Sequence, residues 1–423
     1  MSLAAQDVGR RRGACPTILA PMMSGDGLLV RVKPTASTLS FEAALAIANG
    51  ARRFGNGAID LTNRGNLQLR GLTEGSLHGM SEIVRMHNLA SPDPAFEATR
   101  NLLVDPLGQD DPDASFDSHA VARTLEALLA DDPTFRKLPA KFGILIDASA
   151  RLPLTGVSTD IMVRARGCGC VMALDGGDAS VNVAIDDLPA AIQRLSHIAH
   201  LKGCDAATGT RMRGIVKRHG AARVFRDARV TSLETTEAAH RTDPPVIGYL
   251  PLGGNNGAVG IGAAFGHLDW RTFALLADIA NAEGDGTLRL TPWRAVLLPG
   301  VARNRAEEVV SRARAAGLIV DSEDPRRRVT ACVGRPSCAA ASVDARGHAE
   351  ILAAANLSAG MLHVSGCAKG CAHPKPAALT LVGRDGSYDL IRDGRPGDLP
   401  DRRALDLPEA MMAVRSLSTG TLR

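Results

Sequence analysis

The chain has 423 residues, of which 45% are hydrophobic and 22% are charged, the composition of a globular protein with about three domains. A net charge of +4 does not by itself indicate a nucleic-acid partner, although a local basic site for an acidic small molecule stays open. No apolar run approaches the roughly 20 residues that cross a bilayer, and residues 1–16 contain no hydrophobic signal core. We therefore expect a cytoplasmic protein with no membrane and no nucleic acid among its partners.

Two segments of the chain, about 230 residues apart, repeat the same pattern. The first predicts a strand in residues 25–32, a helix in 41–55 with Ser40 as its N-cap, and a strand in 61–71. The second predicts a strand in 255–262, a helix in 270–286 and a strand in 290–300. Two copies are too few for a solenoid, so duplication followed by specialisation of one half is the simplest interpretation.

The likeness continues through the rest of each half. Residues 100–106 align with 330–336, residues 141–149 align loosely with 361–371, and residues 160–169 align with 379–388. Further helices are predicted in 188–201, 210–226 and 303–317, and the polar stretch 234–245 reads as a linker between the halves. We predict an α+β fold with pseudo-twofold symmetry, in four parts: 1–95, 96–235, 236–322 and 323–423.

Four of the eight cysteines fall close together near the C-terminus: Cys332, Cys338, Cys367 and Cys371. Two closely spaced pairs on two loops can supply the four thiolates of a [4Fe–4S] cluster. Zinc usually takes more tightly spaced ligands, and disulfides are uncommon without secretion, so both are weaker alternatives. The remaining cysteines are expected to be reduced thiols: Cys15, Cys168, Cys170 and Cys204.

The cysteine pattern, the segment LTNRGNLQLRG (residues 61–71) and the duplicated layout resemble the sulfite and nitrite reductase haemoprotein superfamily. The resemblance covers residues from about 12 to about 398. It implies two ferredoxin-like half-domains that pair into one domain, two α/β domains, one per repeat, and a [4Fe–4S] cluster held by the four cysteines. Within the superfamily, residues 12–16, 20–31 and 365–374 are most similar to the branch that acts on precorrins in aerobic cobalamin biosynthesis.

The resemblance also implies a tetrapyrrole site lined by Arg31, Arg64, Gln68, Arg100 and Lys141. Precorrins carry many carboxylates, which arginine binds through two parallel hydrogen bonds. Arg70 is a weaker candidate, because alternation along its strand would turn it toward solvent. Reductases of the superfamily often carry two lysines where this chain has Lys141 and Gly143, which argues against a six-electron reduction.

The activity that the resemblance implies is an oxygen-dependent monooxygenation of precorrin-3A to precorrin-3B, with hydroxylation at C20 and lactone formation. The expected partners are precorrin-3A, dioxygen and an electron donor. That donor would be NADH acting through a separate reductase, because no Gly-x-Gly-x-x-Gly loop opens a βα unit. Two alternatives stay open: a sirohaem-dependent sulfite or nitrite reductase, and a non-catalytic cluster or zinc protein that binds a tetrapyrrole.

The precorrin branch is associated with a second, non-haem iron in place of sirohaem. No pattern of two histidines and a carboxylate stands out as its ligand set. The available histidines include His78, His87, His348, His363 and His373, each of which is by itself more often a surface or packed residue.

Overall fold

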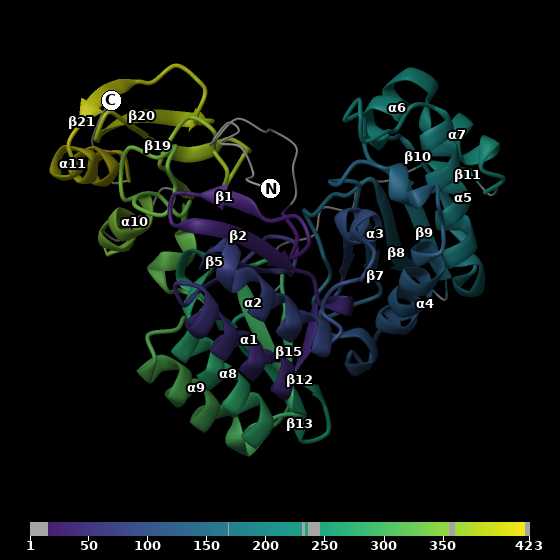
Figure 1. Cartoon of the computed structure of the whole chain (residues 1–423), viewed down its shortest axis with the longest axis horizontal. Coiled ribbons are helices and arrows are strands. Elements are labelled where there is room, and N and C mark those ends of the chain that lie inside the picture. The colour runs from purple at the N-terminus through teal and green to yellow at the C-terminus, as the bar shows by residue number, and fades with distance from the viewer. Residues whose placement is uncertain (1–15, 168, 231–232, 236–245, 355–359, 419–423) are drawn as a thin grey trace.

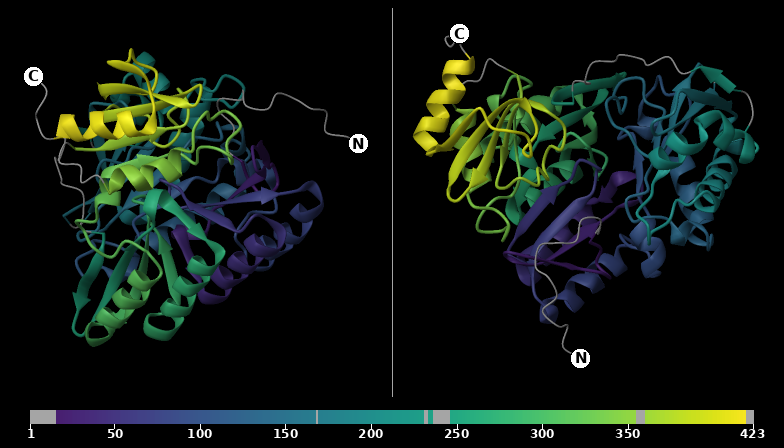
Figure 2. Two further views of the ribbon diagram at one scale, coloured as in Figure 1. Left: turned by 90° about the vertical axis from the view of Figure 1, so that its left-hand side faces the viewer. Right: turned by 90° about the horizontal axis from the view of Figure 1, so that it is seen from above.

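The computed structural model describes residues 16–167, 169–230, 233–235, 246–354 and 360–418. These residues form three lobes, with the paired half-domains between two α/β domains (Figure 1). The view from above in Figure 2 shows the same order, with the yellow C-terminal domain and the blue-to-teal domain on either side. Within the described residues, no helix is both long and apolar enough to cross a membrane.

Each half-domain is a five-stranded sheet with helices packed on one face. The first half-domain contains β1 (Met22–Ser24), β2 (Gly27–Val32), α1 (Phe41–Phe54), β4 (Ala58–Leu61), β5 (Leu67–Leu72) and α2 (Glu74–Met86). The second contains β12 (Gly248–Gly253), β13 (Asn256–Gly262), α8 (Trp270–Glu283), β15 (Thr287–Leu290), β16 (Ala295–Ala302) and α9 (Ala306–Ala315). As predicted, α1 is capped by Ser40, whose Oγ accepts a hydrogen bond from Ala43 N.

The two half-domains exchange one short strand each. The strand β3 (Thr38–Ser40) of the first half pairs with β15, and β14 (His267–Asp269) of the second half pairs with β4. The sheet orders are therefore β1-β2-β5-β4-β14 and β12-β13-β16-β15-β3. Since α1 and α8 also share one aliphatic core, neither sheet is complete without the other half of the chain.

The two α/β domains repeat a second pattern, in which two parallel strand pairs are followed by antiparallel strands. The first domain contains α3 (Pro94–Thr99), β6 (Leu102–Val104), α4 (Ser118–Ala130), β7 (Ile144–Asp147), β8 (Ile161–Arg166), β9 (Gly169–Leu174), β10 (Ala179–Val183), α5 (Leu188–Leu201), α6 (Met212–His219), α7 (Ala221–Asp227) and β11 (Leu233–Thr235). The second contains β17 (Val329–Ala331), α10 (Ala345–Ala353), β18 (Leu362–Ser365), β19 (Ala377–Arg384), β20 (Ser387–Gly394), β21 (Arg402–Leu405) and α11 (Leu407–Ser418). The predicted duplicated α+β fold is thus confirmed.

Three sequence-based expectations need correction or fall outside the described residues. The helix predicted in 210–226 is broken at Gly220, whose φ of +76° ends α6 before α7 begins. The linker predicted from Glu234 begins later, because β11 pairs with β10 as far as Thr235. Residues 236–245, Cys15 and Cys168 lie outside the described part of the chain.

Candidate functional site

The four predicted cluster cysteines lie together at one edge of the C-terminal sheet. Cys332 directly follows β17, and Cys367 follows β18 closely; these strands are parallel neighbours, so the loops leaving them share an edge. The backbone N–H of Gly366 donates a hydrogen bond to Cys332 Sγ at 3.1 Å. Burial raises the pKa of Cys371, and the other three thiols are close enough to raise it further.

Gly366 is required by this close approach. A Cβ atom at that position would lie 2.7 Å from the Cβ of Ala341 and 3.4 Å from Cys332 Sγ. Any side chain would therefore push the second cysteine loop away from the first. The glycine beside Cys367 thus sets how closely the two pairs of thiols come together.

The donor set fits a cluster better than a single ion. Burial raises the pKa of Cys332, so a positively charged inorganic core is needed to hold these thiols ionised together. Among the described residues, no three His, Cys, Asp or Glu side chains converge as the ligands of one ion do. A cubane offers each thiolate a different iron corner, so its ligands stand farther apart than those of one zinc.

The first half of the chain holds the cysteine loop in place. The carbonyl of Ser337, next to Cys338, accepts hydrogen bonds from Gly25 N at 3.1 Å, Ser24 Oγ at 2.8 Å and Arg70 Nη2 at 2.7 Å. Arg70 is also paired with the Asp26 carboxylate. The expectation that Arg70 faces solvent was wrong, because the cysteine domain covers this face of the sheet and leaves the side chain 4% exposed.

A row of polar side chains crosses the same sheet, on the face opposite its helices. Arg31 on β2 lies opposite Gln68 on β5, Gln68 lies opposite Asp60 on β4, and Asp60 lies opposite His267 on β14. Asp60 accepts hydrogen bonds from His267 Nδ1 at 2.9 Å and from Arg346 Nη2 of the cysteine domain at 3.0 Å. Burial raises the pKa of Asp60, but these two contacts outweigh that effect and lower it.

Arg64 reaches from the β4–β5 loop to the first α/β domain. Its Nη1 lies 3.1 Å from the position that a Cβ atom would take at Gly143. The missing side chain at Gly143 therefore leaves the space that the Arg64 guanidinium uses. Lys141, two residues earlier, is exposed. Arg31, Gln68 and Arg64 are each half-buried.

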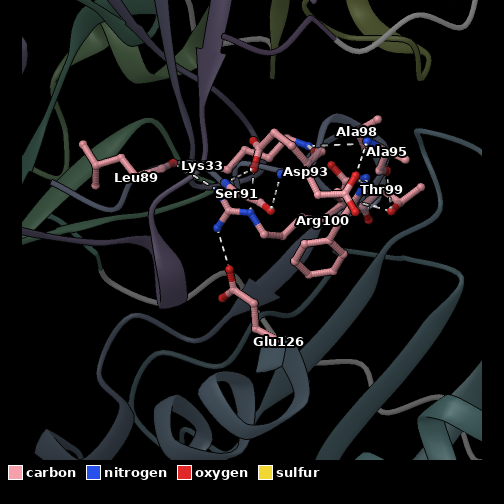
Figure 3. A network of polar contacts seen from close by, with 12 residues as sticks. Lys33, Leu89, Ser91, Asp93, Ala95, Ala98, Thr99, Arg100 and Glu126 are labelled. Atoms are coloured by element: carbon pink, nitrogen blue, oxygen red, sulfur yellow. Dashed lines mark hydrogen bonds and ion pairs between the residues drawn. The ribbon is translucent and has the colours of Figure 1, made fainter. Parts of the chain in front are cut away.

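Arg100 lies in a buried ion-pair network. Its Nε donates to Glu97 Oε2 at 2.9 Å, its Nη1 to Glu126 Oε1 at 2.6 Å and its Nη2 to the Leu89 carbonyl at 3.0 Å. Figure 3 shows Glu126 and the Leu89 carbonyl on either side of its guanidinium. Because these donors are already engaged, the structure gives Arg100 a role in holding α3 and α4 together rather than in meeting a ligand.

Sequence reasoning missed Arg294, which lies near Cys332, and Arg346, which lies near Arg294. Arg294 donates to the Ala372 carbonyl at 3.1 Å, and burial together with the charge of Arg346 lowers its pKa. The only sequence signal was that Arg294 lies in the repeat of LTNRGNLQLRG. His363 is fully buried nearby, and burial lowers its pKa to about 4, so its ring is neutral at physiological pH.

The first repeat carries an aspartate where the second carries Cys332. Asp105 follows β6 as Cys332 follows β17, and Ala148 N donates to Asp105 Oδ2 at 3.0 Å, the counterpart of the Gly366–Cys332 contact. The predicted alignment, which pairs Leu102 with Cys332, is therefore shifted by three residues. Burial and the charge of Asp105 raise the pKa of Asp147 to about 7.

Cys170 and Cys204 are buried in the first α/β domain. Burial raises the pKa of Cys170 to about 11 and that of Cys204 to about 12. Both are therefore protonated packing residues at physiological pH.

Comparisons with known proteins agree with this architecture. Residues 20–87 and 253–316 match the family model of the nitrite/sulfite reductase ferredoxin-like half domain. The solved structure of the Mycobacterium tuberculosis NirA protein covers 92% of this chain with 80% of its own length, at a TM-score of 0.75 and 17% identity. A ferredoxin–nitrite reductase of Synechococcus elongatus is 24% identical, over 87% of this chain and 80% of its own. The fold is thus that of the sulfite and nitrite reductase superfamily.

A relative with higher sequence identity shows to which branch of the superfamily the chain belongs. A precorrin-3B synthase of a Sinorhizobium species is 35% identical over 404 residues, which are 92% of this chain and 84% of the relative. The chain belongs to the precorrin-3B synthase family and is an oxidoreductase of cobalamin biosynthesis.

Proposed function

We propose that the protein is an oxygen-dependent monooxygenase that converts precorrin-3A to precorrin-3B, using a [4Fe–4S] cluster held by Cys332, Cys338, Cys367 and Cys371. One atom of dioxygen enters the substrate as the C20 hydroxyl group, and the other leaves as water. The two electrons come from a reduced partner, for which NADH through a separate reductase is our candidate. The observation that carries the proposal is the contact of the cysteine domain with the polar sheet face of the first half-domain, in a chain of this family.

Side chains on that face, on the β4–β5 loop and in the first α/β domain have a direct role in binding the substrate. Arg64, Arg31 and Lys141 supply positive charge, and Gln68 supplies an amide donor, for the substrate's acetate and propionate groups. Arg64 of the half-domain contacts the first α/β domain, so a carboxylate bound to Arg64 would lie between two lobes. Arg100 is left out of this proposal, because its donors are used by Glu97 and Glu126.

When bound, a cluster held by the four cysteines would supply single-electron transfer, and the non-haem iron that we propose as the second centre would supply the activation of dioxygen. The protein's own contribution is to bind the macrocycle, to present its bridge carbon and to exclude water from it. His267 and Arg346 keep Asp60 ionised at the face where the substrate would lie.

Sulfite or nitrite reduction with sirohaem is the second candidate, and the distant reductase relatives favour it. Gly143 counts against it. Many reductases carry a second lysine there, and in this chain the position has no side chain and its Cβ position lies 3.1 Å from Arg64 Nη1.

The proposal is tested with purified, anaerobically prepared protein. We expect about four irons and four sulfides for the cluster in each chain, a broad brown absorbance, and precorrin-3A conversion only when oxygen and a reductant are both present. Cys367→Ser should lose the cluster and the activity, while Cys204→Ser, a matched thiol outside the site, should keep the cluster. Sharp sirohaem bands with sulfite reduction, or a complete cluster in Cys367→Ser, would contradict the proposal.

A further inference from the structure

His363 is a buried side chain without a hydrogen-bond partner. It lies in the middle of β18 and is 0% exposed, and neither Nδ1 nor Nε2 has a partner among the described residues. Its neighbours Leu362 and Val364 pack into the aliphatic core of the C-terminal domain. Because side chains alternate along a strand, His363 points to the other face of the sheet.

A neutral imidazole that is buried without partners is costly. It carries one N–H donor and one lone pair, and leaving such groups unsatisfied costs about 1–3 kcal/mol each. Buried polar groups without partners are rare and usually mark an absent water or ion, or a functional role. Arg294 lies near His363, but it is a cation and has no lone pair to accept a hydrogen bond from the ring.

A second histidine lies against His363. The ring of His373, two residues after Cys371, is 5.7 Å from the ring of His363 between centroids and tilted by 71°. His373 Nε2 lies 3.3 Å from the Pro376 carbonyl. A carbonyl only accepts, so Nε2 is the donor in this contact, and Nδ1 is the ring nitrogen left to bind a metal ion. Metal-binding histidines are commonly oriented by an N–H donated to a carbonyl in this way.

We propose that His363 and His373 together bind one divalent transition-metal ion beside the cysteine loop. Imidazole nitrogen suits iron, cobalt, nickel, copper and zinc, and does not suit magnesium or calcium. One ligand comes from a strand and the other from the loop that carries Cys371, so the ion would lie between the sheet and the cluster site. No carboxylate joins the two rings within the described residues, which leaves the remaining coordination positions to water, dioxygen or substrate.

This inference rests on the proposed function only in one respect: the two histidines would be ligands of the second metal centre named there. The binding of an ion by the two histidines needs neither oxygen nor precorrin. It can therefore hold if the reaction is a different one, and it can fail while the oxygenation stands.

The test is a titration of the full-length, cluster-containing protein with Co²⁺, followed by visible spectroscopy and equilibrium dialysis. Iron and sulfide are measured throughout, so that Co²⁺ entering the cysteine site is recognised. We expect one Co²⁺ per chain in addition to an intact cluster. His363→Gln and His373→Ala should each weaken Co²⁺ binding at least about tenfold, the lower end of what is lost even when groups behind a metal ligand are removed.

The exposed His78 provides the matched control, since His78→Ala removes a histidine far from the cysteine loop in sequence. Its Co²⁺ affinity should equal that of the unaltered chain. Wild-type protein that binds no Co²⁺ outside the cluster, or a His373→Ala protein with unchanged affinity and spectrum, would overturn the proposal. His373 lies on a loop, where a substitution disturbs folding less than in the buried strand that holds His363. The His373→Ala protein therefore tests the metal site even if His363→Gln does not fold.

Discussion

Removing the Arg70 side chain tests how the first half of the chain holds the cysteine loop. The Arg70 guanidinium donates to both oxygens of Asp26 at 2.9 and 3.0 Å, to Ser24 Oγ and to the Ser337 carbonyl. In Arg70→Ala, Asp26, which is 13% exposed, loses its cationic partner and keeps only the hydrogen bond from Asn56 Nδ2, and breaking a buried pair on one side costs about 3–5 kcal/mol. The Ser337 carbonyl still accepts hydrogen bonds from Ser24 and Gly25. Losing its third hydrogen bond, from Arg70, therefore adds little to the cost.

The expected loss is visible in thermal unfolding of the cluster-containing protein under anaerobic conditions. Taking about 2 °C for each kcal/mol, Tm should fall by about 6–10 °C. Iron should also pass to a chelator faster, since the loop that carries Cys338 loses an anchor. The matched control is Arg85→Ala, whose partner Glu82 is exposed, and its Tm should change little.

A double-mutant cycle separates the ion pair from simple loss of packing. Asn at position 26 carries no charge, so Arg70→Ala should cost less in the Asp26→Asn background, by a coupling of about 0.5–3 kcal/mol. Two results would refute the reasoning: a Tm for Arg70→Ala within the range of Arg85→Ala, or strictly additive effects in the cycle.

Three further outcomes are expected. Arg100→Ala should lower the free energy of unfolding by about 3–5 kcal/mol, because Glu97 is left charged and buried, while the precorrin affinity of folded protein stays unchanged in a fluorescence titration. Arg64→Ala should weaken precorrin binding by about 1.5–3 kcal/mol. Gly143→Lys should also weaken binding, because the new side chain displaces the Arg64 guanidinium. If both variants bind precorrin with unchanged Kd, Arg64 is not part of the site. The pKa of Asp147 in the folded chain is raised from about 3.8 to about 7, so its stabilising effect is complete below pH 4 and is lost as pH rises toward 7. In Asp147→Asn, Tm should therefore depend less on pH over this range. Parallel Tm–pH profiles for the variant and the unaltered chain would contradict the raised pKa.

Local signals in the sequence predicted much of the fold. Ser40 before an amphipathic stretch defined the start of α1, and the duplicated strand–helix–strand pattern led to the correct fold class. The exchange of β3 and β14 was not predictable in this way. Each strand is only three residues long and pairs with a partner more than 200 residues away, so no local pattern carries that information.

In the candidate site, too, some residues could be predicted from the sequence and others could not. The cysteines were identified because four thiols at such spacing have few other uses, and the structure brings them together. Arg70 and Arg100 could not be placed, because an arginine looks the same in sequence whether it meets a ligand, solvent or a buried carboxylate. Their roles depend on Asp26 and Glu126, which only the folded chain brings within reach.

The most direct test of the account is a single turnover with purified protein, precorrin-3A, a reductant and ¹⁸O₂. We predict that one labelled oxygen atom appears in the product as the C20 hydroxyl group and that no product forms without oxygen. Product formed under strict anaerobiosis, or a C20 oxygen that comes from water, would contradict the assignment of this protein as a monooxygenase.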